Sequence, residues 1–472
     1  MFDRARATLA RMIAPERTRR FDAAGGGRRW EGGNFFGRTS TETLGATEPI
    51  MRRARGAYVN NPWIRNGVDA LVTSTVGAGL VPASQHPDPD TRKRLDAIFK
   101  AWCRRADMDG RTSWEGLVAE GVRAMMVDGE TLFHLVEMVD GPKVRILPAE
   151  MLDSSKTMNL DGGAYVIAGV ECNAAGVRVA YHISPTKPTD AFDTWQAPIR
   201  VDAREVLHAF QMLGAGQMRG VSALAPVLLT AKDFDELTDA LLMAAKVSAL
   251  LGVFFVDVNN TGSLPFDGEQ VGSILQSGLE PGAAKIIPGG FDVKTLTPQQ
   301  LQGTIDFAKL TLRQIAAGLG VPEHLLTGDL SQATYSSLRS CLASFKQRVE
   351  RLQYHTIVPA LLDPMWRRVI TAAAIRGEID LGEDIESALA VEWIAPPVLS
   401  PDPSKDADAV GKLLDLGLTS RRRAIAELGW SADEIDAERA ADRARETLMG
   451  LVTEKPAVPK TETISGGPTN GA

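Results

Sequence analysis

Six histidines and three cysteines are the side chains in this sequence best suited to acid–base, nucleophilic or metal chemistry. The cysteines, Cys103, Cys172 and Cys341, lie far apart and form no CxxC pair, so their spacing predicts neither a zinc site nor a disulfide framework. The sequence also lacks the GxxxxGK(S/T) loop of nucleotide hydrolases, the HExxH pair of zinc proteases and the GxSxG turn of serine hydrolases. We therefore expect no enzyme, no cofactor and no metal.

Two of the histidines, His208 and His324, lie in surroundings that indicate their roles. His208 lies in the apolar run 206–210, which is typical of a buried structural histidine rather than a catalytic base. His324 lies in a polar loop and could act as a base, but no nucleophile stands near it in the sequence. A hydrolase site assembled from distant segments stays an alternative that the motifs do not address.

Length and charge restrict the class of protein. A chain of 472 residues is too long for one ordinary core, which predicts two to four structural units. The net charge of -7 argues against a dedicated nucleic-acid binder, although DNA could still pass such a surface without being retained. No apolar run reaches the roughly 18 to 20 residues that span a bilayer, so we expect a soluble, intracellular protein without membrane contact.

The first half of the chain predicts an α+β unit. Asn61 and Pro62 are suited to the N-cap and first position of a helix that ends near Gly77, and two amphipathic helices should follow at 90–104 and 113–127. Short strands are expected between about 131 and 211. Two of them, 165–167 and 177–181, should be joined through the hairpin connection 173–176.

The middle of the chain predicts two long antiparallel helices with a small α/β insertion. Residues 222–252 read as one helix of about 46 Å, with an apolar seam formed by Val227, Phe234, Leu237, Leu241 and Ala244. The insertion, 253–301, should contain strands at 253–258 and 285–287 and a short helix near 268–278. The helical pattern resumes at 302–319.

A polar loop, 320–339, precedes the next long helix. That helix carries an apolar stripe at alternating steps of four and three residues, formed by Leu338, Leu342, Phe345, Val349 and Leu352. Pro359 and Pro364 should kink or break it before it ends near 376. A proline-rich linker at 395–403 then leads to a helical unit at 404–449.

The two ends contain few large apolar side chains. Residues 1–56 are rich in Arg and Gly, which predicts a flexible basic arm, and 450–472 predict a disordered tail. The segment 416–430 has three adjacent arginines and a helix-turn-helix pattern. However, residues 432–446 carry many carboxylates, which would repel the phosphates of DNA and so argue against sequence-specific DNA binding by this segment.

Several short blocks, in order along the chain, resemble the portal proteins of tailed bacteriophages, specifically the lambda-type family. They include RFDAA at 20–24, NNP at 60–62, VGAGLVP at 76–82, GQMRGVSAL at 216–224, TYSSLR at 334–339 and DPSK at 402–405. The resemblance extends over roughly 20–447. Phe21 stands where the family pattern leads us to expect Tyr. Gene transfer agents use similar portals, and the blocks do not separate a phage, a prophage and a gene transfer agent.

The resemblance implies a mainly helical α+β portal fold that forms a ring, normally of twelve subunits. It assigns a flexible basic arm (1–56), an α+β wing (57–221), a stem helix (222–252), a clip (253–301), a second stem helix (302–320), a tunnel loop (321–337), a long kinked wing helix with its linker (338–401), a helical crown (402–449) and a disordered tail (450–472). The ring would be the DNA channel at one capsid vertex, through which the genome is packaged and ejected.

The resemblance also implies surfaces and partners. The tunnel loop would line the channel through His324, Leu325, Leu326, Thr327, Asp329, Ser331, Gln332, Thr334 and Tyr335. The stem would face the channel through Asp235, Glu236 and Asp239. The clip would dock partners through Asp257, Asn259, Asn260, Phe266 and Lys285. The implied partners are further copies of the chain, the terminase large subunit, a head-completion or adaptor protein, the major capsid and scaffold proteins, and double-stranded DNA bound without sequence preference.

The place of action would be the virion, at the portal vertex of the capsid, and the host cytoplasm during assembly. The tunnel loop has Glu323 and Asp329 but no Lys before Arg339, which suits a surface that DNA passes with little friction. The alternative function is a non-viral helical scaffold that oligomerises without a channel. A hydrolase and a DNA-binding regulator acting through 411–436 are further alternatives.

Overall fold

The computed structural model describes residues 39–185, 196–250, 299–331, 334–382, 384–397 and 402–451, and four three-residue strands between 254 and 287. The predicted arm as far as Arg38, and the tail from 452, lie outside the described residues. From Thr39 onward the arm prediction is wrong, because Thr39–Asn60 is helix α2. Met51 and Ala54 are buried, so α2 is held by its packing on the α+β body formed by 57–221 and 338–394, for which the name wing is kept as a label only.

Three helices of the wing begin where a side chain caps them. Helix α3 (Pro62–Val76) has Asn61 as its N-cap, whose side chain accepts a hydrogen bond from the Ile64 N–H, and it ends at Gly77. Helices α4 (Pro89–Cys103) and α5 (Trp114–Val127) are capped in the same way by Asp88 and Ser113. All three agree with the predicted helices to within one or two residues.

Two antiparallel sheets complete the wing. Strands β2 (Glu130–Met138), β3 (Gly141–Leu147) and β9 (Val206–Phe210) pair in the order β3-β2-β9. The second sheet runs β4-β5-β6-β7-β8, formed by Met158–Asn159, Tyr165–Ile167, Val170–Cys172, Arg178–Ile183 and Ile199–Asp202. Short 3-10 helices at Ala149–Met151, Asp161–Gly163 and Ala203–Glu205 join these strands.

The predicted hairpin at 173–176 is present but joins different strands. It links β6 to β7, and β5 pairs with β6 rather than with β7. The expectation missed β6 because this three-residue strand follows a two-residue turn. In that turn Ala168 and Gly169 adopt φ values of +46° and +83°. Such a tight turn between two short strands leaves almost no periodic pattern.

An aromatic cluster occupies the centre of the wing. The ring of Phe99 lies 5.3 Å from Trp102, 5.2 Å from Trp366 and 5.8 Å from Trp393, measured between centroids. Trp393 belongs to β14 (Val391–Ile394), which pairs antiparallel with β1 (Val81–Ser84). The cluster therefore joins segments from both halves of the sequence into one core.

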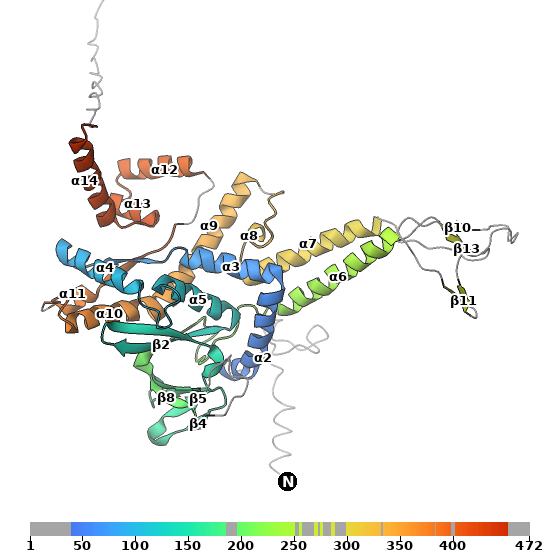
Figure 1. The fold of residues 1–472 in the computed structure, drawn as a ribbon, viewed down its shortest axis with the longest axis horizontal. Coiled ribbons are helices and arrows are strands. Elements are labelled where there is room, and N and C mark those ends of the chain that lie inside the picture. The colour runs from blue at the N-terminus through green and yellow to red at the C-terminus, as the bar shows by residue number, and fades with distance from the viewer. Residues whose placement is uncertain are drawn as a thin grey trace, which may run out of the picture.

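The predicted long helices form a hairpin that projects from the wing (Figure 1). Helix α6 spans Leu228–Leu250 and α7 spans Gln299–Leu319. Residues 223–227 form turns, so helix α6 begins six residues later than the predicted stem helix. The seam of α6 is confirmed, because Phe234 is buried and Leu237, Leu241 and Ala244 are half-buried while the intervening residues are exposed.

Beyond the hairpin, the structure describes four short strands. β10 (Phe254–Val256) pairs in parallel with β13 (Lys285–Ile287), which lie in the two predicted strand regions. β11 (Glu269–Val271) pairs antiparallel with β12 (Ile274–Gln276), so the short helix predicted near 268–278 is wrong. Val271, Ile274 and Leu275 are apolar residues within a short run, a pattern that fits either a strand or a helix.

After α7, the chain forms α8 (Glu323–Thr327), α9 (Tyr335–Leu352), a π-helical stretch (Gln353–Leu362) and α10 (Asp363–Ile375). The two prolines do not break this helix. Pro359 lies in the π-helical stretch, where the bonding pattern differs from that of an α-helix, and Pro364 lies in the first turn of α10. Helix α11 (Ile385–Leu389) then precedes β14.

The predicted helical unit at the C-terminal side consists of α12 (Pro403–Asp415), α13 (Arg421–Glu427) and α14 (Ala432–Leu448). It lies over one side of the wing (Figure 1). Ion pairs join it to the wing, among them Arg92–Asp433, Lys100–Glu434 and Arg339–Asp406. The fold is α+β and mainly helical, as predicted. Within the described residues, no helix is long and apolar enough to cross a bilayer.

Candidate functional site

Helix α8 anchors the loop that the sequence singled out. The Leu326 side chain is fully buried, and Gly67 of α3 lies so close that a Cβ there would stand 2.8 Å from Leu326. The Asn66 amide donates hydrogen bonds of 2.8 Å to the carbonyls of Leu325 and Leu326. The expectation that Leu326 faces a channel is therefore wrong. Leu325 is half-buried beside it, and Thr327 is half-buried at the end of α8.

The exposed part of the loop begins where α8 ends. Gly328 adopts a left-handed conformation with φ of +71°, and Asp329, Leu330 and Ser331 after it are exposed. The hydroxyl and the N–H of Ser331 both donate hydrogen bonds to the Asp329 carboxylate, and these bonds lower the pKa of Asp329. The positive charge of Lys309 lowers this pKa further. Asp329 is therefore a fixed negative charge at the tip of the loop.

The loop ends in a capped helix start. Thr334 is the N-cap of α9, and its hydroxyl and that of Ser337 bond each other's backbone N–H groups in a capping box. Tyr335 is the first residue of α9. Gln332 lies outside the described residues. Asp329–Ser331 on one side and Thr334 on the other are thus held close to α8 and α9, and all four residues are exposed.

His324 lies at a hollow of about 260 Å³ between α7, α8 and α9. Burial lowers the pKa of His324, so its imidazole is neutral at neutral pH. Beside it, the Arg313 guanidinium pairs with Glu323 at 2.9 Å. The hollow is lined by Lys309, Arg313, Glu323, His324, Asp329, Ser337, Leu338 and Cys341.

The predicted stem residues share one side of α6. Asp235, Glu236 and Asp239 are exposed and fall in a sector of about 100° directed away from α7, given 3.6 residues per turn. Asp235 also accepts a hydrogen bond of 2.9 Å from the Asn61 amide, which ties α6 to the start of α3. The three carboxylates therefore lie on one side of α6, and that of Asp235 is also hydrogen-bonded to the wing.

Most of the predicted docking residues of the insertion lie outside the described residues. These are Asp257, Asn259, Asn260 and Phe266. Lys285 is the first residue of β13, opposite Phe254 in the parallel pair. The structure therefore places Lys285 on a strand at the far end of the hairpin from the wing, as Figure 1 shows.

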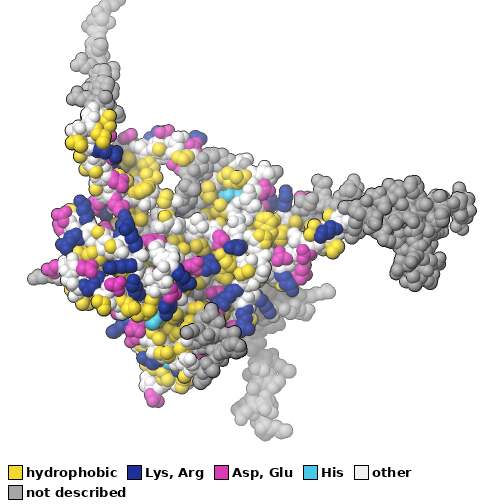
Figure 2. Space-filling view, in the orientation of Figure 1, with side chains coloured by type: hydrophobic (Ala, Val, Ile, Leu, Met, Phe, Trp, Pro, Cys, Tyr) yellow, Lys and Arg dark blue, Asp and Glu magenta, His cyan; other side chains and the backbone are white. Residues whose placement is uncertain are grey.

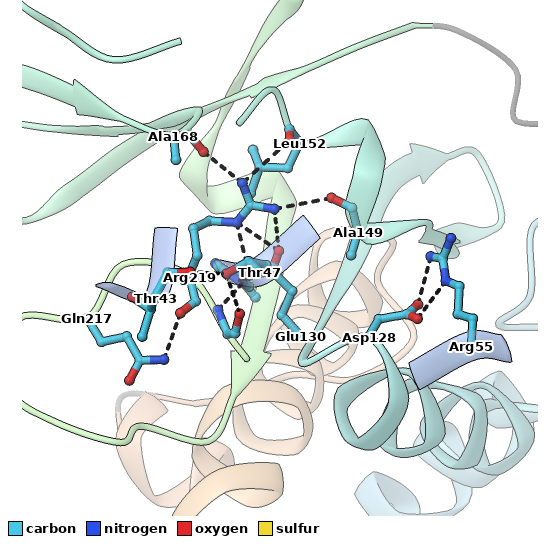
Figure 3. A network of polar contacts seen from close by, with 12 residues as sticks. Thr43, Thr47, Arg55, Asp128, Glu130, Ala149, Leu152, Ala168, Gln217 and Arg219 are labelled. Carbon is cyan, nitrogen blue, oxygen red and sulfur yellow. Dashed lines mark hydrogen bonds and ion pairs between the residues drawn. The ribbon is translucent and has the colours of Figure 1, made fainter. Parts of the chain in front are cut away.

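A buried ionic network supports the segment that leads into the hairpin (Figure 3). Arg219 donates to Glu130 through Nε at 2.8 Å and Nη2 at 2.5 Å, and to the Ala168 carbonyl at 2.9 Å. The Gly220 N–H donates to Glu130 at 2.9 Å, and the Thr47 hydroxyl of α2 to the Gly220 carbonyl at 3.4 Å. One arginine therefore connects β2, the second sheet and the approach to α6.

The network also explains His208. Its Nε2 lies 3.0 Å from Glu130, and burial lowers the pKa of His208, so a neutral imidazole donates to the carboxylate. Burial alone would raise the pKa of Glu130, but the Arg219 charge and the His208 bond outweigh it and hold that pKa at about 2. His208 is a buried structural histidine, as the sequence predicts. Glu130 was missed, because nothing local marks it as the partner of a residue 89 positions away.

The described residues contain no group of three or more His, Cys, Asp or Glu side chains that could hold a metal ion. The loop tip and the α6–α7 hairpin carry exposed side chains of both apolar and acidic type.

Comparison with known proteins places the chain in a family. The model of the phage portal protein family, lambda type, matches residues 27–353. The probable portal protein of Halomonas phage phiHAP-1 is 23% identical over 424 residues, which cover 86% of this chain and 82% of the relative. Portal protein B of Escherichia phage lambda is 22% identical over 402 residues, covering 76% and 74%.

Similar solved structures include a chain of the neck of a native gene transfer agent particle, computed with C12 symmetry. It is 15% identical with a TM-score of 0.42, and the match covers 81% of this chain and 93% of that one. An HK97 family phage portal protein from Corynebacterium diphtheriae is 14% identical with a TM-score of 0.29, covering 79% and 97%. The family model spans more than two thirds of the sequence, from before α2 to the beginning of the π-helical stretch. This chain belongs to the lambda family of phage portal proteins.

Proposed function

We propose that this protein is the subunit of a closed ring that forms the DNA channel at one vertex of a capsid. The genome would enter through the ring during packaging and leave through it during ejection. The observation that carries the proposal is the projecting α6–α7 hairpin, whose apolar side chains stay exposed in the single chain. Figure 2 shows hydrophobic and acidic side chains on its surface.

The exposed apolar residues of the hairpin favour contact with another chain that would bury them. Leu229 is 72% exposed, Phe307 57% and Leu242 54%, on a hairpin that the wing does not cover. Each such side chain gains on the order of 1.5–3 kcal/mol when it is fully buried. A ring repeats one interface at every subunit boundary, so modest contacts close a stable assembly. Family membership and this surface together favour a ring over an isolated subunit.

The channel wall would combine the stem carboxylates with the loop tip. Asp239 on the side of α6 away from α7, with Asp235 and Glu236 at the two edges of that side, and Asp329 on the loop, would present negative charge to the phosphates of DNA. Between Gly320 and Arg339 the sequence has no Lys or Arg. Because each phosphate contact by a cation adds salt-dependent affinity, such a wall lets DNA slide. His324, Ser331, Gln332, Thr334 and Tyr335 belong to the same proposed lining.

The strands beyond the hairpin would bind partners. We assign to residues 253–301 the contacts with the terminase large subunit during packaging and with a head-completion or adaptor protein afterwards. Major capsid and scaffold proteins would surround the wing. ATP hydrolysis would belong to the terminase, so the portal itself needs no catalytic site. The protein would reside in the virion, after assembly in the host cytoplasm.

Electron microscopy of the purified protein, with light scattering for mass, tests the proposal. We expect rings of about twelve copies with an open axis. A defined oligomer without an axial opening would contradict the channel and support the alternative function, a helical scaffold. Incubation with ATP in the absence of terminase should release no phosphate above the buffer control.

A further inference from the structure

The α6–α7 hairpin has two flanks of different character. In each helix, seam residues point at the other helix, and the residues immediately before and after a seam residue turn by about 100° to opposite sides. Because the helices are antiparallel, residues that precede seam positions share one flank in both helices. Residues that follow seam positions share the other flank.

The first flank, which we call the acidic flank, carries Asp233 and Glu236 of α6. They precede the seam residues Phe234 and Leu237, and both are exposed. The same flank carries Phe307 of α7, which is also exposed. Among the described residues, Glu236 pairs with Lys232 at 3.6 Å, which is a weak ion pair because both side chains are largely exposed.

The opposite flank, which we call the basic flank, carries Lys309 and Arg313 of α7 and Leu242 of α6. They follow the half-buried seam residues Ala308 and Leu312 of α7 and Leu241 of α6, and all three are exposed. Arg313 is paired with Glu323 at 2.9 Å. Asp235 also lies on this flank, where Asn61 bonds its carboxylate. Lys309 shares its hollow with Asp329, whose pKa its charge lowers, but no ion pair of 4 Å or less holds it among the described residues. It is therefore the cation of this flank best placed to meet a second chain.

The complementary groups lie at matching distances from the wing. Counted at 1.5 Å per residue, Glu236 stands about 12 Å from the first residue of α6, and Lys309 about 15 Å from the last residue of α7. Phe307 and Leu242 stand about 18 and 21 Å out by the same count. An offset of about 3 Å is within the reach of a lysine or glutamate side chain.

We propose that neighbouring copies of the chain pack acidic flank against basic flank, with Glu236 of one copy opposite Lys309 of the next and Phe307 opposite Leu242. A ring interface joins two different patches of the same molecule, and the two flanks supply such a pair in both charge and apolar content. The proposal rests on the ring of the proposed function and names the surface by which it closes.

Charge reversal tests the pairing. Glu236→Lys and Lys309→Glu each place like charges opposite one another at every boundary of the ring. We expect either variant alone to need about ten times the protein concentration of the wild type for half-assembly into rings. The measurement is light scattering combined with particle counts by electron microscopy. Circular dichroism of each variant verifies that the subunit stays folded, and Lys346→Glu on α9 is the charge-matched control, expected to assemble normally.

Mixing the two variants gives the sharper result. In a one-to-one mixture, alternating copies meet opposite charges at both flanks, so rings should return at wild-type concentration. The double variant Glu236→Lys/Lys309→Glu should assemble alone, since each boundary then carries the exchanged pair. Single variants that form rings as the wild type does, or failures that neither the mixture nor the double variant repairs, would contradict the flank pairing.

A covalent test separates this inference from the proposed function. Phe307→Cys with Leu242→Cys, in a Cys341→Ser background that removes the exposed native thiol, should yield a ladder of disulfide-linked multimers on oxidation. Rings that give no ladder and also assemble normally after charge reversal would overturn the flank pairing while leaving the channel intact. Wild-type protein that forms no ring would overturn the proposed function itself.

Discussion

Arg219 is the residue on which three parts of the wing converge. Its guanidinium bonds Glu130 on β2 and the Ala168 carbonyl beside the second sheet, and its neighbour Gly220 is bonded by α2. Because both charged groups are buried, each needs the other to offset its loss of hydration. The segment that leads into the α6–α7 hairpin is therefore fixed at its start, which sets the direction in which α6 projects.

Replacing Arg219 by Ala should destabilise the wing strongly. The substitution leaves the Glu130 carboxylate buried without its charged partner, so we expect the free energy of unfolding to fall by about 3–5 kcal/mol. The measurement is urea unfolding followed by tryptophan fluorescence. Arg52→Ala breaks the exposed pair with Glu48 and is the control, expected to stay within about 1 kcal/mol of the wild type. Equal losses in the two variants would refute the role of the buried network.

Asp96 makes stability depend on pH. Burial, together with the charges of Glu434 and Asp433, raises the pKa of Asp96 to about 6. The folded state thus holds this proton more tightly than the unfolded chain, so stability falls as pH rises through about 6. Asp96→Asn keeps the oxygen that accepts from the Ser84 N–H but carries no charge.

Thermal unfolding from pH 4 to pH 8 tests this assignment. The Asp96→Asn protein should melt at a higher temperature than the wild type at pH 8, and the gain should vanish towards pH 4. The exposed Asp90→Asn on the same helix removes a charge without relieving burial and should give no such gain. A gain that is the same at every pH would show that ionisation of Asp96 is not its cause.

At the scale of elements, local patterns predicted most of the helices. The cap residues Asn61, Asp88 and Ser113 stand directly before α3, α4 and α5, and the seam of α6 repeats at steps of three and four residues. These signals act within a few residues of the chain. The sequence alone is therefore enough to predict where these helices lie and that α6 and α7 form a hairpin.

The missed elements depend on distant contacts. The π-helical stretch keeps Pro359 inside a continuous helix, and the Gln353 side chain in it donates to the Thr75 carbonyl of α3 at 2.7 Å. Strand β6 follows a tight turn at Ala168, and the predicted helix near 268–278 is a pair of strands. No spacing within these segments reveals the partner that decides their conformation.

In the loop 320–339, too, local signals were read correctly and distant contacts were missed. The sequence located the loop, but the prediction treated Leu325 and Leu326 of α8 as exposed, like the residues that follow them. Leu326→Ala should remove a fully buried side chain and cost about 2–5 kcal/mol in unfolding free energy. Leu330→Ala, four residues on and 56% exposed, should stay within about 0.5 kcal/mol. Chemical denaturation of both variants decides whether α8 is the anchor and 328–331 the free tip.

At the scale of the whole molecule, the proposed channel predicts an effect of charge at the loop tip. Asp329→Lys would place about twelve cations around the DNA path, each able to contact phosphate. We expect slower and less complete packaging, with a deficit that shrinks as salt is raised. Asp329→Asn removes the negative charge without adding a positive one and should package close to normally. Packaging that Asp329→Lys leaves unchanged would remove the support for a low-friction wall.

The pairing of β1 with β14 has a consequence for how the protein is made. Ser84 lies opposite Val391, so this sheet joins residues separated by more than 300 positions of sequence. On the ribosome, the segment bearing β14 emerges only after the whole stem has been synthesised. The wing core around Phe99 and Trp393 therefore cannot close until translation is nearly finished. During that interval the exposed apolar side chains of the α6–α7 hairpin are already outside the ribosome, where they can contact other chains before the core has closed.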